Sequence, residues 1–173
     1  MYKYRVYNKY STKISQIENE QKECIGYIRK FYKNVLERVV DYVGNANLIN
    51  RFEVLNSNQE VVFRAKRGNP FRWKKYHVEY YYKDETFEFE MIQKDFLKVT
   101  NITEFSFNGK NYSMEQTFGA WAELIDKESG KTIAKWKIKF VSPFYGNLEV
   151  LDEEYEEYRL FLLGIFHAYF YGK

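Results

Sequence analysis

The chain has 173 residues and a formal net charge of +3, which fits one domain and is too mild a charge to indicate a partner by itself. Aromatic residues make up 20% of the sequence, and this content favours a β-rich core. The single cysteine, Cys24, excludes an intramolecular disulfide, and the residues after Met1 lack the apolar stretch of a signal peptide. We therefore expect one domain over residues 1–173, located in the cytoplasm.

The N-terminal segment has the pattern of short strands. Tyr2, Tyr4 and Val6 recur at every second position, which is the period of a half-buried strand. Further extended segments are predicted over residues 13–17 and 24–31.

One internal helix is predicted over residues 35–43. Asn34 can act as its N-cap, with Glu37 three residues later, and Gly44 can close its end. Its apolar side chains recur at helical spacing: Leu36, Val39, Val40 and Val43.

From Leu48 onward the sequence is a series of predicted hairpins. The predicted strand pairs are 52–55 with 61–65, 76–82 with 87–91, 104–107 with 110–114, and 122–125 with 132–138. The Asn108-Gly109 turn is the strongest of the hairpin signals. A last strand is predicted over residues 148–150. Turns at this spacing are typical of a barrel or a sandwich.

The C-terminal segment Leu160–Tyr171 is apolar or aromatic on every side. As a helix it would span roughly 18 Å, well short of the ~30 Å hydrocarbon core of a bilayer. A helix of this kind must be enclosed by protein. We therefore predict a mainly β fold: a closed antiparallel β-barrel of about twelve strands around a central hydrophobic C-terminal helix. His167 is then expected to be a core histidine, hydrogen-bonded to a backbone carbonyl or a buried tyrosine.

This order of elements resembles the tubby C-terminal-like fold. The hairpin over residues 52–66 is similar to a strand, turn and strand signature of the LURP-one-related branch, with Gln59 where that pattern prefers glycine. In its details the chain resembles small bacterial tubby-like proteins of Firmicutes type. The resemblance implies a closed barrel around a helix, a fold shared by tubby proteins, LURP-one-related proteins and phospholipid scramblases. It also implies a relation to eukaryotic members that bind phosphoinositides or act at membranes.

The residues show no catalytic or metal-binding constellation. His77, His167 and Cys24 have no ligand spacing, and no Gly-rich phosphate loop or nucleophile elbow occurs. The acidic residues over 149–157 lack the EF-hand pattern and fit the start of a helix, with Asp152 as N-cap. We expect no cofactor, no metal and no enzymatic activity.

A basic segment is the candidate binding site. Six cations occur within residues 64–75 without an acid among them, interleaved with aromatic residues around a Gly-Asn-Pro loop. Such a mixture is attracted to an anionic bilayer, although a solvated surface with its charges neutralised by acids elsewhere would give the same pattern. The candidate residues are Arg64, Lys66, Arg67, Arg72, Trp73, Lys74 and Lys75.

The leading hypothesis is a non-enzymatic, cytoplasmic, tubby-like binding module. Its partner would be a protein or an anionic membrane surface, the latter placing it peripherally at the inner face of the membrane. One alternative is a tail-anchored or scramblase-like protein that inserts residues 158–171, and another is an enzyme with an unrecognised site. Nucleic acid is not expected, because the net charge is small and the aromatic residues largely alternate inward.

Overall fold

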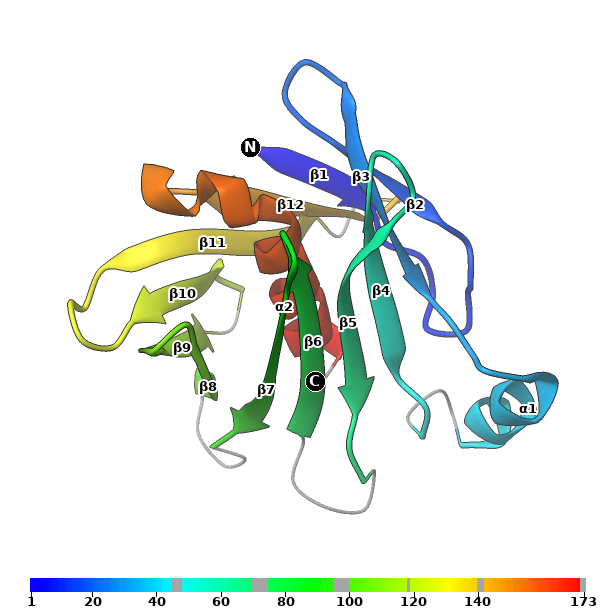
Figure 1. Cartoon of the computed structure of the whole chain (residues 1–173). Helices are drawn as coiled ribbons and strands as arrows, with labels where there is room; N and C mark the ends of the chain where they lie inside the picture. Colours follow the sequence, from blue (N-terminus) through cyan, green and yellow to red (C-terminus); the bar gives the residue numbers. More distant parts are fainter. Residues whose placement is uncertain (45–47, 70–74, 95–99, 118, 140–141, 172–173) are drawn as a thin grey trace.

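The computed structural model describes residues 1–44, 48–69, 75–94, 100–117, 119–139 and 142–171. They form a closed antiparallel barrel of twelve strands, two α-helices and a 3₁₀ helix, which confirms the predicted fold (Figure 1). The strands are β1 (Tyr2–Arg5), β2 (Ser15–Glu18), β3 (Cys24–Lys30), β4 (Arg51–Asn56), β5 (Val61–Arg67), β6 (Lys75–Tyr82), β7 (Glu85–Gln93), β8 (Thr100–Phe107), β9 (Lys110–Thr117), β10 (Ala122–Asp126), β11 (Thr132–Lys139) and β12 (Tyr145–Val150). The helices are α1 (Val35–Val43), η1 (Glu153–Tyr158) and α2 (Arg159–Tyr171).

Each strand pairs with its sequence neighbour, and the first strand closes the barrel by pairing with the last. Tyr2 lies opposite Leu148 in β12, and Tyr4 lies opposite Ile17 in β2. The last strand starts at Tyr145, earlier than predicted, because its first residues pair with β1. Alternation fixes the register, since a slip by one residue in β11 would exchange Trp136 for lysines in the core.

Helix α2 fills the barrel. Phe161 makes ring contacts with aromatic side chains of β5, β6, β7 and β8, while Phe166 stacks on Trp136 of β11. Leu162, Leu163, Phe166 and Ala168 have no exposed surface. A helix that contacts strands on opposite walls lies inside the sheet, as the sequence predicts.

The approach to α2 differs in detail from the prediction. The Asp152 carboxylate accepts a hydrogen bond from the Glu154 amide, which confirms this residue as a cap. The element it caps is η1, a 3₁₀ helix, and α2 begins only at Arg159.

His167 is a core histidine, as predicted, and its partner is a tyrosine. Its Nδ1 atom lies 2.9 Å from the Tyr4 hydroxyl, and its ring contacts the edge of Phe52. This pair links α2 to the first strand of the barrel.

A close approach between α2 and β5 requires glycine at position 164. A Cβ atom there would lie 2.5 Å from the Phe63 ring, well inside van der Waals contact. We expect Gly164→Ala to destabilise the fold by about 1–3 kcal/mol through overpacking, although alanine has the better helix propensity. Urea unfolding measures the loss, and Phe63→Leu in the same chain should recover part of it. Stabilisation by Gly164→Ala would contradict this packing.

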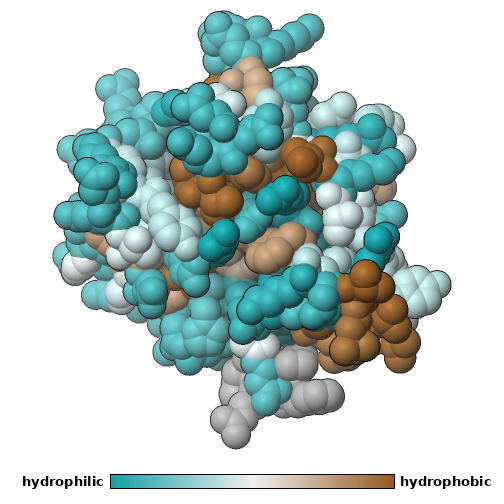
Figure 2. Space-filling view, turned by 45° about the vertical axis from the view of Figure 1, so that its right-hand side comes forward, coloured by the Kyte–Doolittle hydropathy of each residue, from teal (hydrophilic) through white to brown (hydrophobic). Residues whose placement is uncertain are grey.

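Helix α1 forms over the predicted residues but turns its apolar side outward. The Asn34 side chain accepts from the Glu37 amide at 2.9 Å, as an N-cap does, and the Gly44 amide closes the last turn on Val40. The Glu37 carboxylate accepts from the Lys33 amide, one residue before the cap. The apolar residues of α1 are exposed, and Figure 2 shows them as a hydrophobic patch at the lower right of the surface.

Candidate functional site

The antiparallel order of the strands gives the barrel two distinct ends. Odd-numbered strands finish and even-numbered strands begin at the end that carries α1, which we call the α1 end (Figure 1). The opposite end carries η1 and is called the η1 end. Every connection between consecutive strands therefore belongs to one end or the other.

The connections of the two ends differ in sequence. At the η1 end, the segments 19–23, 57–60, 83–84, 108–109 and 127–131 contain no aromatic residue. At the α1 end, each of the segments 6–14, 31–50, 68–74, 94–99, 118–121 and 140–144 contains at least one aromatic residue. Among the connections between strands, aromatic side chains are thus confined to one end. Beyond the strands, the η1 end carries two tyrosines of η1, Tyr155 and Tyr158, which pack against the core.

The described aromatic residues of the α1-end connections are not enclosed in the core. Tyr42 and Phe144 are exposed, and every other described one keeps some exposed surface. They are Tyr7, Tyr10, Phe31, Tyr32, Tyr42, Trp121 and Phe144. Barrel closure by itself does not account for aromatic side chains that remain in contact with solvent.

Charge follows the same division. Exposed cations at the α1 end are Arg5, Lys9, Lys13, Lys33, Arg38, Lys66, Lys94 and Lys139. Exposed acids at the η1 end are Glu20, Glu23, Glu60, Asp84, Glu85, Glu128, Glu153, Glu154, Glu156 and Glu157. The η1 end also carries exposed lysines, half as many as its exposed acids: Lys22, Lys83, Lys110, Lys127 and Lys131. The exposed charge of the described residues is therefore net basic at the α1 end and net acidic at the η1 end.

Acids of the α1 end are mostly held in ion pairs. Asp41 lies 2.6 Å from the Lys30 ammonium, Glu37 pairs with Arg51, and Glu90 pairs with Lys75. The Lys75 ammonium holds the pKa of the Glu90 carboxyl below its usual range. Among the described residues of this end, two further acids, Glu115 and Glu123, lie on β9 and β10, across the barrel from α1.

Some residues of the predicted basic segment lie at the α1 end, and others form ion pairs with acids of neighbouring strands. Arg64 lies in mid-strand, where its Nε atom donates to Glu53 of β4 at 2.9 Å. Lys66 is exposed near the end of β5, and the Arg67 amide donates to the Asn50 carbonyl. Lys75 begins β6 and pairs with Glu90 at 2.5 Å. Three predicted residues lie outside the described part of the chain: Arg72, Trp73 and Lys74.

The sequence shows a second basic stretch in Lys3, Arg5, Lys9 and Lys13, but it did not reveal the acid partners or the contribution of Lys33 and Arg38. Residues 64–75 contain no acid, but antiparallel pairing brings Glu53 and Glu90 from neighbouring strands. Lys33 and Arg38 join the site because both lie close to the end of β3. These cations could have been found from the sequence by comparing every second connection, because aromatic and basic residues recur in the connections of one end.

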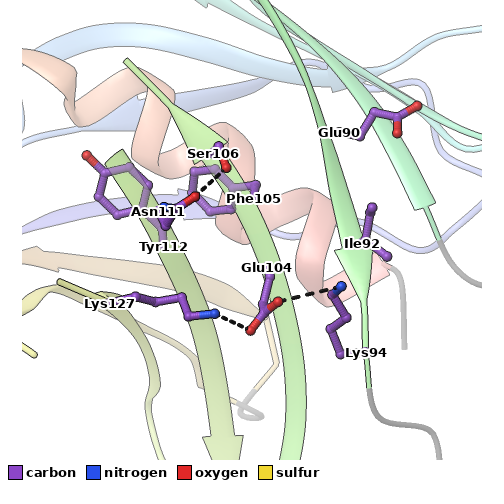
Figure 3. Close-up of a pocket in the computed structure, with 9 residues that line it drawn as sticks. All are labelled: Glu90, Ile92, Lys94, Glu104, Phe105, Ser106, Asn111, Tyr112 and Lys127. Atoms are coloured by element: carbon purple, nitrogen blue, oxygen red, sulfur yellow. Dashed lines mark hydrogen bonds and ion pairs between the residues drawn. The ribbon is translucent and has the colours of Figure 1, made fainter. Parts of the chain in front are cut away.

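A small pocket lies on the barrel wall where β7 and β8 diverge (Figure 3). It has a volume of about 180 Å³. Beside it β7 and β8 pair Ile92 with Glu104 and Gln93 with Thr103, and the Lys94 amide donates a hydrogen bond to the Ile102 carbonyl. The Lys127 ammonium, 2.7 Å away, and the Lys94 ammonium, 3.7 Å away, flank the Glu104 carboxylate. Lys127 lowers the pKa of Glu104, which keeps the carboxylate charged rather than ready to act as an acid.

The described residues contain no cluster of His, Cys, Asp or Glu suited to holding a metal ion. In the same part of the chain, none of the helices has the length and apolar character needed to cross a membrane.

A closed antiparallel barrel around a buried C-terminal helix defines the structural class of this protein as tubby-like. A family model described as the Tubby C-terminal like domain matches residues 2–172, and the chain belongs to that family. The family is generally non-enzymatic. No curated protein and no solved structure matches the chain.

Proposed function

We propose that this tubby-like barrel is a non-enzymatic binding module that attaches peripherally to an anionic membrane surface through its α1 end. The observation that supports this is the difference between the two ends. The connections of the α1 end are aromatic and basic, whereas those of the η1 end lack aromatic residues, carry acids and lysines in nearly equal number and lead to the acidic helix η1. Aromatic side chains favour the bilayer interface, and each lysine or arginine near an anionic surface contributes ~1 kcal/mol. The acidic η1 end would face away from the lipid.

This proposal leaves the core intact. A tail anchor formed by residues 158–171 would require α2 to leave the barrel, which would expose the buried rings of Phe63 and Trp136. The outer surface of the α1 end can meet lipid without that cost. In the cytoplasm the anionic surface would be the inner face of the membrane.

Vesicle sedimentation tests the proposal. We expect the chain to sediment with phosphatidylcholine vesicles that contain phosphatidylserine, and to remain in solution with phosphatidylcholine alone. Binding should weaken steeply between about 0.1 M and about 1 M salt, because the Debye length falls from ~10 Å to ~3 Å.

Two matched variants locate the binding surface. Lys33→Glu/Arg38→Glu/Lys66→Glu reverses exposed cations at the α1 end, and Lys22→Glu/Lys83→Glu/Lys110→Glu makes the same charge change at the η1 end. Only the first is expected to lose binding, and reversal of Arg72 and Lys74 should weaken it as well. Equal loss of vesicle binding in both triple variants would show that binding depends on net charge and not on the α1 end. If the wild type does not bind, the membrane proposal is wrong and a protein partner becomes the favoured hypothesis.

A further inference from the structure

The polar side of α1 holds the helix on the barrel. The Asp41 carboxylate is fully buried and accepts hydrogen bonds from the Lys30 ammonium at 2.6 Å, the Tyr32 hydroxyl at 2.7 Å and the Ile49 amide at 2.8 Å. Glu37 pairs with Arg51 at the start of β4. Both acids of this helix are therefore directed at the barrel and neutralised there.

The opposite side of α1 consists of large apolar side chains in contact with solvent. Their exposed fractions lie between 40% and 78%. They are Val35, Leu36, Val39, Val40, Tyr42 and Val43. Burying one aliphatic side chain of this size is worth about 1.5–3 kcal/mol, so a helix that leaves them outside forgoes much of its packing energy. A contiguous patch of this kind marks an interaction surface.

The charges beside the patch indicate what covers it. The exposed charged residues of α1 and its N-terminal approach are Lys33 and Arg38, both cations. A second copy docked about a two-fold axis would bring these cations against their own counterparts. An anionic lipid surface has the complementary charge and an apolar layer beneath it, which suits a helix with an apolar side and cationic flanks.

The position of α1 agrees with this occupant. The helix connects β3 to β4 at the α1 end, and Tyr10 of the β1–β2 connection contacts Tyr42 with ring centroids 5.4 Å apart. The patch is thus in contact with Tyr10, a half-buried aromatic residue from another connection of that end.

We propose that α1 is an interfacial helix, which buries its outward apolar side in the headgroup and acyl boundary of an anionic bilayer while Asp41 and Glu37 hold it on the barrel. This rests on the proposed membrane function and assigns the inserting element. An amphipathic helix of this type lies in the plane of the interface, with its apolar side buried roughly 5–10 Å into the headgroup and acyl boundary.

Environment-sensitive fluorescence tests the insertion. In a Cys24→Ser background, Val39→Cys is labelled with a nitrobenzoxadiazole dye, and Ser57→Cys, in the β4–β5 turn at the η1 end, serves as the control. With phosphatidylserine-containing vesicles, we expect a several-fold rise in emission at position 39 and no change at position 57.

Unlabelled variants provide a second measurement. Val39→Asn/Val43→Asn should bind the same vesicles roughly tenfold more weakly without loss of the helix, because asparagine and valine have similar helix propensities. Leu151→Asn removes an exposed apolar residue near the η1 end and should leave binding unchanged.

The outcomes separate this inference from the proposed function. One outcome is that wild type sediments with anionic vesicles, the emission of the label at position 39 does not rise, and the double asparagine variant binds as wild type does. In that case the insertion of α1 is wrong and the membrane-binding proposal stands. If wild type fails to sediment, both are wrong. Emission at position 39 that rises with protein concentration in the absence of vesicles would assign the patch to a second copy and overturn the inference.

Discussion

Acidification below about pH 6.5 is expected to destabilise the barrel by about 1.4 kcal/mol per pH unit through His167 alone. Complete burial lowers the pKa of His167 from 6.5 to about 3. Between these two values the unfolded chain binds a proton that the folded chain does not, so stability is present above pH 6.5 and is lost as the pH falls. The Tyr4 hydroxyl, 2.9 Å away, offers no charge that would offset the protonation.

Urea unfolding of wild type and His167→Gln measures this effect. Glutamine keeps a hydrogen-bonding side chain near Tyr4 but does not titrate. Between about pH 6.5 and about pH 5, wild type should lose about 2 kcal/mol more than the variant, in a range above the usual carboxylate pKa values. Equal losses of unfolding free energy in the two proteins would show that His167 binds a proton in the folded chain as readily as in the unfolded chain, which would contradict the lowered pKa.

Removing the Asp41 carboxylate is expected to cost about 3–5 kcal/mol, because it leaves the Lys30 ammonium buried without its partner. Lys30 and Asp41 have side-chain exposures of 4% and 0%. Burial lowers the pKa of Lys30, and Asp41 opposes that shift. For Asp41, burial would raise the pKa, but hydrogen bonds from Lys30, Ile49 and Tyr32 hold it below its usual value.

The double variant Lys30→Met/Asp41→Leu distinguishes a buried charge from lost packing. It should be more stable than Asp41→Ala, since it leaves no isolated charge in the interior. Amide exchange over residues 35–43 should be faster in Asp41→Ala than in wild type if the carboxylate anchors α1. A double variant less stable than Asp41→Ala would indicate that the ion pair itself, rather than avoidance of an isolated charge, stabilises this region.

The barrel could be predicted because its signals are local. Alternation around Trp136 fixes a strand and its buried face, and the all-apolar segment ending at Tyr171 requires an enclosure. Asn34 and Gly44 marked the limits of α1 within one residue. What the sequence did not indicate is which side of α1 faces solvent. An apolar stripe normally packs inward, whereas here contacts made by residues outside the helix, among them the Lys30 and Arg51 ion pairs, hold its polar side inward.

The basic segment illustrates a second limit of local reasoning. Arg64 and Lys75 counted as unopposed cations when residues 64–75 were considered by themselves, yet Glu53 and Glu90 pair with them across the sheet. Lys66 fits the expectation of an exposed cation. A charged surface on a barrel is set by strand order and register, which bring together residues far apart in the sequence.

Hydrogen–deuterium exchange with anionic and with neutral vesicles tests most directly whether the α1 end is the membrane-facing end. The account predicts that phosphatidylserine-containing vesicles slow exchange over residues 7–14 and 31–44, with no change over 19–23 or 151–158 and no effect of phosphatidylcholine alone. Slowed exchange confined to the η1 end, or none at either end when the chain is bound, would contradict it.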